Sequence, residues 1–306
     1  SDASRVFVPP HSLSSGVFHV KQTDHFLAPL AKDIGLRIEC SNAAREYVSP
    51  WQRISVEATR GFGRLYHLDG HAMAAEADEF IIHEGLAHIA AFAHPAPVSA
   101  LILGGGDGAS ARELLKHPSL TRIVVAELDP DVVRVVSAEI VTLPAGAFDN
   151  PRVALHIGDA AETLRTLHAR GERFDLILFD LTEPDDPACA HLHGDAFLHL
   201  CAASLTPNGL IHTQLGSPFY QPDKVRTLML RLRSVFPAVG SSLINVPLYG
   251  GPWLLAHASL ADLPMPDEAC LAARLAVRGI EALRYYNPAL HLASSVLPNY
   301  VRDLLA

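Results

Sequence analysis

The sequence predicts an α/β protein in which a small antiparallel β region precedes a doubly wound, largely parallel sheet. Strand-like and helix-like segments alternate through the middle of the chain, and a glycine-rich turn joins the first strand of this series to a helix. With 49% hydrophobic and 19% charged residues, the 306-residue chain can bury a large core. We expect a flexible tail over residues 1–15, a β domain over 16–75 and an α/β domain over 76–306.

Composition excludes several classes of function. The formal net charge of −9 argues against a nucleic-acid surface and is compatible with a cationic ligand. The most apolar window, 85–103, is interrupted by His88, His94, Pro95 and Pro97, so we expect no membrane span. The N-terminus does not resemble a signal peptide, and the four cysteines lack metal or redox spacing, as expected for a cytoplasmic protein. The 17 histidines form no HExxH or Cys/His pattern, so no metal site is expected.

The first region carries short runs in which apolar and polar residues alternate, as in half-buried strands. The runs are GVFHVKQ, GLRIEC, QRISVEAT and GRLYHLDG. Turn residues separate them, and Asp69-Gly70 favours a tight hairpin turn. These features predict an antiparallel sheet.

From Glu76 the pattern becomes helical, and this helix is expected to end at Pro95. Strands then alternate with helices, which is typical of βαβ units around a buried parallel sheet. The expected strands are 100–103, 122–128, 153–157, 174–180 and 209–215, and the helices between them are 109–117, 130–140, 160–170 and 195–204. A helix at 221–235, strands near 239–246 and 253–258 and an irregular or helical tail complete the chain.

Polar residues and turns follow five successive strands, at the edge of the sheet where doubly wound proteins bind ligands. They are Gly104 to Gly108, Glu127, Gly158-Asp159, Asp180 and Gln214. A purely structural role as a helix cap would explain Asp159 alone. It does not explain the whole set, which therefore predicts a ligand site.

The glycine turn resembles a nucleotide-binding motif. Gly104, Gly106 and Ala109 satisfy the relaxed dinucleotide fingerprint. Glu127 lies 19 positions beyond Gly108, where a Rossmann-type domain places the acid that binds ribose hydroxyls. On these residues alone, NAD remains a possible ligand.

Asp107 argues against a dinucleotide. A diphosphate on this turn would meet its carboxylate, and two like charges at about 4 Å repel by roughly 4 kcal/mol at an effective dielectric constant of 20. A ligand with a sulfonium and an ammonium would instead be attracted. Intact S-adenosylmethionine carries a carboxylate beside its amine, whereas the decarboxylated form keeps only the amine. Asp107, with Asp180 on the same rim, therefore favours decarboxylated S-adenosylmethionine.

Over residues 50 to 300 the chain resembles the polyamine aminopropyltransferases, the spermidine synthase family. The motifs that carry the resemblance are WQRISVE, GRLYHLDG, ADEFIIHEGLAH, LGGGDGASARE, AELDPDVV, GDA, FDLILFDLTEPDDPA, TQ, NVPLYG and RYYNPALHLASSVLPNYV. The resemblance implies a methyltransferase-like, Rossmann-type catalytic domain behind a small β domain. It implies a cytoplasmic homodimer or homotetramer that uses decarboxylated S-adenosylmethionine as co-substrate, needs no further cofactor, and releases methylthioadenosine.

The resemblance also implies roles for residues at matching positions. Those expected to hold the donor are Gln52, Gly104, Gly106, Asp107, Glu127, Asp159, Ala160 and Pro187. Among them, Glu127 would bind the ribose, Asp159 would lie near the adenine, and Asp107 would bind the aminopropyl ammonium. Pro187 would belong to a loop that closes over the site.

The residues expected to bind the acceptor amine, a small polyamine, are His83, Asp107, Asp180, Glu183, Gln214 and Tyr249. Asp180 would also be the catalytic acid/base group. Structural alternatives exist for His83, as a buried helix histidine, and for Tyr249, as a core aromatic residue.

Three positions depart from the usual putrescine-using pattern: Ile82 replaces a tyrosine, Glu183 an aspartate and Ala160 a glycine. EADEFI and GASARE also lean towards the thermospermine synthase branch, which uses spermidine. Putrescine is the first expectation for the acceptor and spermidine the alternative. The rival interpretations are a small-molecule methyltransferase that uses S-adenosylmethionine and a non-catalytic nucleoside-binding module.

Overall fold

The structure is a computed structural model that describes residues 20–21, 24–181, 189–261 and 265–306. The tail expected over residues 1–15 lies outside this range. No helix in the described ranges has the length and apolarity needed to span a membrane.

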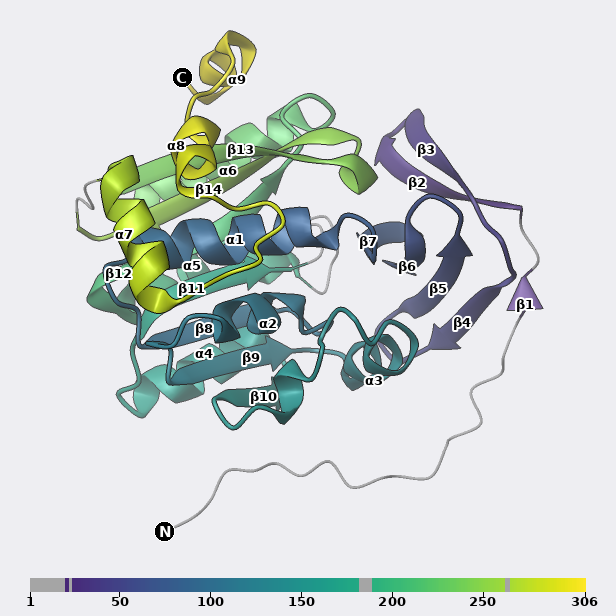
Figure 1. Cartoon of the computed structure of the whole chain (residues 1–306), viewed down its shortest axis with the longest axis horizontal. Coiled ribbons are helices and arrows are strands. Elements are labelled where there is room, and N and C mark those ends of the chain that lie inside the picture. The colour runs from purple at the N-terminus through teal and green to yellow at the C-terminus, as the bar shows by residue number, and fades with distance from the viewer. Residues whose placement is uncertain (1–19, 22–23, 182–188, 262–264) are drawn as a thin grey trace.

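The N-terminal region is antiparallel throughout, as predicted (Figure 1). A five-stranded sheet has the order β1 (Val20–Lys21), β4 (Ala44–Val48), β5 (Arg53–Thr59), β6 (Gly63–Leu68) and β7 (His71–Ala75), and a separate hairpin joins β2 (His25–Ala31) to β3 (Ile34–Glu39). Asp69 and Gly70 have φ values of 48° and 89°, so both residues of the β6–β7 turn are left-handed. This conformation matches the twist of the flanking strands, and it confirms the hairpin expected at this dipeptide.

The second sheet has seven strands in the order β10-β9-β8-β11-β12-β14-β13. They are β8 (Ser99–Gly104), β9 (Arg122–Glu127), β10 (Val153–Ile157), β11 (Phe174–Asp180), β12 (Leu205–Gly216), β13 (Ala238–Val246) and β14 (Gly251–Ser259). The first five in this order are parallel to one another, and β14 runs antiparallel to both of its neighbours, β12 and β13. Strand β12 begins at Leu205, four positions before the sequence predicts. Pairing of Leu205 with Phe174 of β11 extends it through a segment whose Pro-Asn-Gly composition indicates a turn.

Helices cover both faces of this sheet. They are α1 (Glu79–Ala93), α2 (Ala109–Leu115), α3 (Pro130–Glu139), α4 (Ala160–Ala169), α5 (Asp195–Ala203), α6 (Pro222–Val235), α7 (Glu268–Arg278), α8 (Pro288–Ser294) and α9 (Asn299–Leu305). Each face of the sheet has its own core, and strand β8 contributes to both, because successive side chains of a strand point to opposite faces. Leu101 and Leu103 join one core with α4, α5 and α6, whereas Ala100 and Ile102 join another with α1 and α2.

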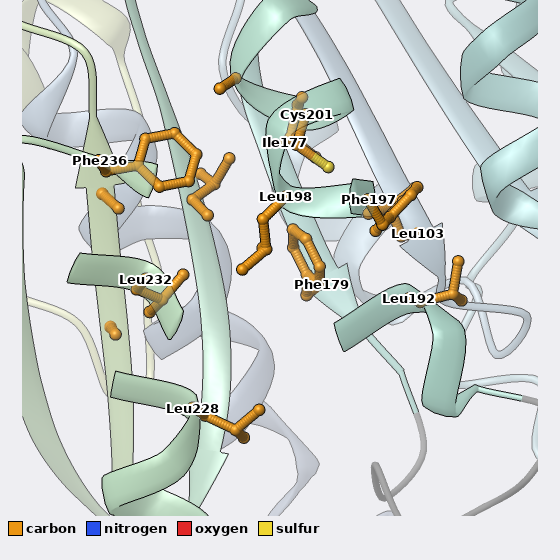
Figure 2. Close-up of a cluster of buried hydrophobic side chains, with 14 of the residues drawn as sticks. Leu103, Ile177, Phe179, Leu192, Phe197, Leu198, Cys201, Leu228, Leu232 and Phe236 are labelled. Atoms are coloured by element: carbon orange, nitrogen blue, oxygen red, sulfur yellow. The ribbon is translucent and has the colours of Figure 1, made fainter. Parts of the chain in front are cut away.

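Aromatic and leucine side chains fill the first of these cores. Figure 2 shows Phe179 of β11 close to Phe197 and Leu198 of α5, with Leu232 and Phe236 further along the same layer. The rings of Phe179 and Phe197 meet edge-on, with centroids 6.0 Å apart. This packing fixes the end of β11, where Asp180 follows Phe179 directly.

A third core joins the two sheets. Ile54 of β5 and Leu68 of β6 are buried in one cluster with Val132 and Val136 of α3. Because α3 follows β9 directly, this cluster fixes the N-terminal sheet against the edge of the α/β sheet that carries Glu127. The β region and the α/β region are therefore expected to unfold together.

We expect Ile54→Ala to lower the free energy of unfolding by about 2–5 kcal/mol, since it removes a fully buried side chain from this shared core. The protein has two tryptophans, Trp51 in the β region and Trp253 on β14. In urea, fluorescence of Trp51→Phe and Trp253→Phe variants should report coincident transitions that move together when Ile54→Ala is added. A transition at Trp51 that precedes the one at Trp253 would contradict this. Val277→Ala, at a side chain 86% exposed, is the control and should change little.

Candidate functional site

A cavity lies at the carboxyl ends of the parallel strands, and β2, β6 and β7 of the N-terminal region form its opposite wall. Every described residue of the expected site lies on its wall: Gln52, His83, Gly104, Gly106, Asp107, Glu127, Asp159, Ala160, Asp180, Gln214 and Tyr249. Glu183 and Pro187 lie outside the described residues. The structure therefore brings together side chains from both sheets that are up to about 200 positions apart in the sequence.

The glycine turn is required by close contacts with the neighbouring strands. Gly104 has a φ of +77°, and a Cβ atom there would lie 2.2 Å from the carbonyl oxygen of Asp180. A Cβ atom on Gly106 would lie 2.7 Å from Oε2 of Glu127. The glycines thus let the turn approach the two acids that end β9 and β11, and this approach draws the acids into one site.

Asp107 is buried, and each of its carboxylate oxygens accepts a hydrogen bond. Its Oδ1 accepts a hydrogen bond from the backbone N–H of Ala109 at 2.9 Å, and its Oδ2 accepts one from the hydroxyl of Tyr66 at 3.0 Å. Nε2 of His83 lies 3.5 Å from the same Oδ2. Burial alone would raise the pKa of Asp107, but His83 and these hydrogen bonds hold it below its ordinary value. Asp107 is therefore an ionised carboxylate whose charge is partly balanced within the protein.

Asp180 ends β11 beside the turn, where its backbone carbonyl accepts a hydrogen bond from Gly105 at 3.0 Å. Its side-chain Oδ2 is buried and makes no hydrogen bond to any described residue. Burial and the nearby charge of Asp107 raise the pKa of Asp180 to about 6. A carboxylate with an unused oxygen and this pKa is suited to accept a proton near neutral pH.

Glu127 ends β9 and is held by backbone donors. Oε2 accepts from the N–H of Gly106 at 3.0 Å and Oε1 accepts from the N–H of Asp129 at 2.8 Å. Burial raises the pKa of Glu127 to about 7. Each oxygen keeps a further lone pair, so the carboxyl can also accept hydrogen bonds from ligand hydroxyls.

Gln52 lies on the cavity wall and is held by Asp129, a residue that the sequence analysis did not identify as part of the site. Its Nε2 donates to Oδ2 of Asp129 at 2.9 Å, and the hydroxyl of Ser49 donates to the same oxygen at 2.6 Å. Oδ1 of Asp129 caps α3 by accepting from the N–H of Asp131. The signal in the sequence is an aspartate before a proline at a helix start, which marks an N-cap.

Asp159 has the structural role that the sequence analysis allowed for it. Its Oδ1 caps α4 by accepting from the N–H of Glu162 at 2.8 Å, and Ala160 begins that helix. Its Oδ2 lies 2.7 Å from Nε2 of His191, which follows the undescribed segment 182–188. One oxygen therefore shapes the helix start, while the other faces the rim of the cavity.

The wall towards β14 is aromatic. The hydroxyl of Tyr249 donates to the carbonyl oxygen of Met73 at 2.6 Å, and Nε1 of Trp253 donates to Oε1 of Gln214 at 3.1 Å. The rings of Tyr249 and Trp253 have centroids 4.7 Å apart. Ile82 is not on the wall but in the core cluster that contains Trp253, so its effect on this wall must pass through that cluster.

The sequence analysis did not identify Tyr66, Met73 or Trp253, although each lies on the cavity wall. All three belong to strands or turns whose alternation identifies a buried face, but the alternation does not indicate which buried side chains border a cavity. Tyr66 had the clearest signal, since it lies in a strand close to the Asp-Gly turn.

His83 lies between two carboxylates. Its Nδ1 is 2.8 Å from Oε2 of Glu79, and its Nε2 faces Asp107. Burial alone would lower the pKa of His83, but the acids raise it well above its ordinary value. Atoms of His83, Asp107 and Asp180 lie within 4.8 Å of one another, a spacing that also suits metal ions. Nε2 of His83 in this group already faces Oδ2 of Asp107 at 3.5 Å, so His83 is paired with an acid rather than open towards an ion.

Comparison with known proteins agrees with this geometry. Residues 79–261 match the spermine/spermidine synthase domain family. A polyamine aminopropyltransferase from Nitrosomonas europaea is 37% identical over 284 residues, which cover 92% of this chain and 86% of the relative. A spermidine synthase solved in complex with the transition state analogue AdoDATO superposes with a TM-score of 0.85 at 30% identity, covering 94% of this chain and 96% of the other. Spermidine synthase from Thermotoga maritima gives a TM-score of 0.83 at 31% identity, with the same coverage. The chain therefore belongs to the spermine/spermidine synthase family and is an aminopropyltransferase.

Proposed function

We propose that the enzyme transfers the aminopropyl group of decarboxylated S-adenosylmethionine to putrescine, forming spermidine and releasing methylthioadenosine. The observation that carries this proposal is the unused Oδ2 of Asp180, buried beside Asp107 on the wall of a cavity that also contains Glu127. The relative solved with AdoDATO supports a donor of this kind. We also propose that residues 16–75 and 76–306 act as two domains with the site between them, in a cytoplasmic homodimer or homotetramer.

In this proposal the donor lies along the carboxyl ends of β8, β9 and β10. Glu127 accepts hydrogen bonds from the ribose hydroxyls, and the wall around Gln52, Asp159 and Ala160 holds the nucleoside. Asp107 attracts the ammonium of the aminopropyl arm. Pro187 would close over the nucleoside from the segment that follows β11.

The reaction is a displacement at carbon. The lone pair of a neutral acceptor amine attacks the carbon next to the sulfonium, the carbon–sulfur bond breaks, and its electrons stay on sulfur as the thioether of methylthioadenosine. A free alkyl amine has a pKa near 10.4, so its deprotonation at pH 7 costs roughly 4–5 kcal/mol. Asp180 accepts the proton that the nitrogen gives up, and alignment of the two reactants lowers the barrier further.

The acceptor would lie along the aromatic wall, between Asp180 and the residues Gln214, Tyr249 and Trp253, with His83 beneath it and Glu183 in the following segment. This wall offers two aromatic rings in contact and an amide, in the same cavity as the reactive carboxylate. Putrescine is proposed first, and spermidine is the alternative because Ile82 and Glu183 depart from the usual putrescine pattern.

The test is a product assay. With decarboxylated S-adenosylmethionine, we expect putrescine to give spermidine and an equal amount of methylthioadenosine, measured by chromatography. Cadaverine, agmatine and spermidine are the competing acceptors. A higher kcat/KM with spermidine than with putrescine would show that spermidine is the preferred acceptor. Methyl transfer from intact S-adenosylmethionine, with no aminopropyl transfer to any amine, would overturn the proposed donor.

We expect Asp180→Asn to lower kcat/KM by about 10²–10⁴-fold, because the amide cannot accept the proton. In the parent enzyme kcat/KM should rise with pH through about 6, where Asp180 ionises, and the variant should lose this limb. Asp175→Asn, at the other end of β11, is the control and should keep the limb. Unchanged turnover of Asp180→Asn would remove the catalytic assignment.

We expect Asp107→Asn to reduce the preference for the decarboxylated donor over intact S-adenosylmethionine by at least about ten-fold, measured calorimetrically as the ratio of the two Kd values. A full repulsion of roughly 4 kcal/mol would predict more, but the cationic His83 shares the charge of Asp107. Asp159→Asn is the control, since it should affect both donors equally through their common adenosine. Equal binding of both donors by the parent protein would contradict the role of Asp107.

A further inference from the structure

A row of buried charges runs from the cavity into the protein between α1 and α2. Asp107 faces His83, and His83 pairs with Glu79 at 2.8 Å. Arg112 then donates to both oxygens of Glu79, at 3.1 and 2.8 Å. The signs alternate along this row, and the two inner charges, on His83 and Glu79, each lie between two of the opposite sign. The reaction proposed above uses only the end of the row that reaches the cavity.

Arg112 is fixed in this position by all of its donor groups. Nη1 donates to the carbonyl oxygens of Thr142 and Leu143, and Nε donates to Oε1 of Glu113 at 2.9 Å. Burial alone would lower the pKa of Arg112, but its two acidic neighbours raise it, so the guanidinium stays charged. A fixed guanidinium leaves Glu79 an ionised carboxylate in a single orientation.

Glu79 in turn determines the charge of His83. The Glu79 carboxylate can only accept a hydrogen bond from Nδ1, and Nε2 lies at an ion-pair distance of 3.5 Å from Oδ2 of Asp107. A neutral imidazole that gave its single N–H to Glu79 would turn the lone pair of Nε2 towards the Asp107 carboxylate, which is unfavourable. We propose that Glu79, oriented by Arg112, is a positioning residue that holds His83 as a permanent imidazolium beneath Asp107 and Asp180.

The groups around His83 come from every element packed near it. At the start of its own helix they are the N-cap Asp78 and Glu79, and on α2 the charged group is Arg112, which pairs with Glu79. From the cavity side they are Asp107, Asp180 and, through Asp107, Tyr66. On β12, His212 faces the helix but bonds the carbonyl oxygen of Leu86. On α7, Arg274 and Arg278 bond carbonyls at the far end of the helix. The anionic neighbours thus outnumber the cationic ones on the side where His83 lies.

A fixed imidazolium at this place has two effects on the proposed reaction. It favours the ionised form of Asp180, which the neighbouring charge of Asp107 opposes. It also disfavours the protonated form of the acceptor amine beside Asp180. This helps the reaction, because the nucleophile must be a neutral amine. His83 therefore acts through its charge and not as a base.

The first test measures His83 directly and needs no turnover, so it stands even if the proposed acceptor or donor is wrong. Nitrogen-15 NMR of the imidazoles in the parent protein should show both ring nitrogens of His83 protonated up to at least pH 8.5. Its signal is the one absent from His83→Gln. A neutral ring at pH 8 would overturn the proposal.

The second test is kinetic and rests on the proposed function. In Glu79→Gln the imidazole of His83 loses its anionic partner and should hold its proton less tightly. Asp180 then loses a neighbouring cation and should ionise at higher pH. We expect the acidic limb of kcat/KM to move up by about one to two pH units, as weakening of a cationic charge whose nitrogen lies within 4.8 Å of the Asp180 carboxylate implies. Glu79→Asp, which keeps the carboxylate, should leave the acidic limb close to its position in the parent enzyme.

Glu84→Gln is the matched control. Glu84 lies on the same helix and is equally buried, but it accepts hydrogen bonds from the backbone N–H groups of residues 284–286. Its loss should lower stability without moving the limb. A limb that moves equally in Glu84→Gln, or stays in place in Glu79→Gln, would show that Glu79 has only a structural role. If Glu79→Gln does not fold, the NMR measurement on the parent protein decides.

Discussion

The arrangement of the site depends on the contact between the glycine turn after β8 and the ends of its two neighbouring strands. Gly105 donates a backbone hydrogen bond to Asp180, and Gly106 donates one to the side chain of Glu127. A side chain at Gly104 or Gly106 would collide with the same partners. Because β8 lies between β9 and β11, this contact brings the acids of these two strands to opposite sides of one turn. Asp107 is then the third carboxylate between them.

The N-terminal sheet completes this site rather than adding a separate unit. The core shared by β5, β6 and α3 fixes it against the edge of the α/β sheet, and Tyr66 of β6 reaches across to hold Asp107. Gln52 and Ser49 reach across in the same way to Asp129 at the start of α3. Packing between the two regions therefore orients groups on the cavity wall.

Local patterns in the sequence were sufficient for the fold and for the acidic rim of the cavity. The parallel strands end at or just before a polar residue or a turn, and the topology brings those ends together, so Glu127, Asp159 and Asp180 could be predicted to lie on one rim. What the sequence could not show are pairings made across elements. The contact of His83 with Asp107, the hydrogen bond from Tyr66 and the early start of β12 depend on tertiary geometry that has no local signal. The sequence analysis consequently treated Asp107 as an isolated charge, whereas the structure pairs it.

This pairing changes how the charge of the cavity should be understood. Three carboxyl groups lie in a buried site, and like charges at this distance cannot all ionise without compensation. The imidazolium proposed for His83 compensates part of this charge, and the pKa values of Asp180 and Glu127 are still raised to about 6 and about 7. A cationic ligand would supply the missing charge and lower both pKa values. Binding of the proposed donor, which carries a sulfonium and an ammonium, would therefore favour the ionised form of Glu127 at pH 7, and it would keep Asp180, already mostly ionised there, available as a base down to lower pH.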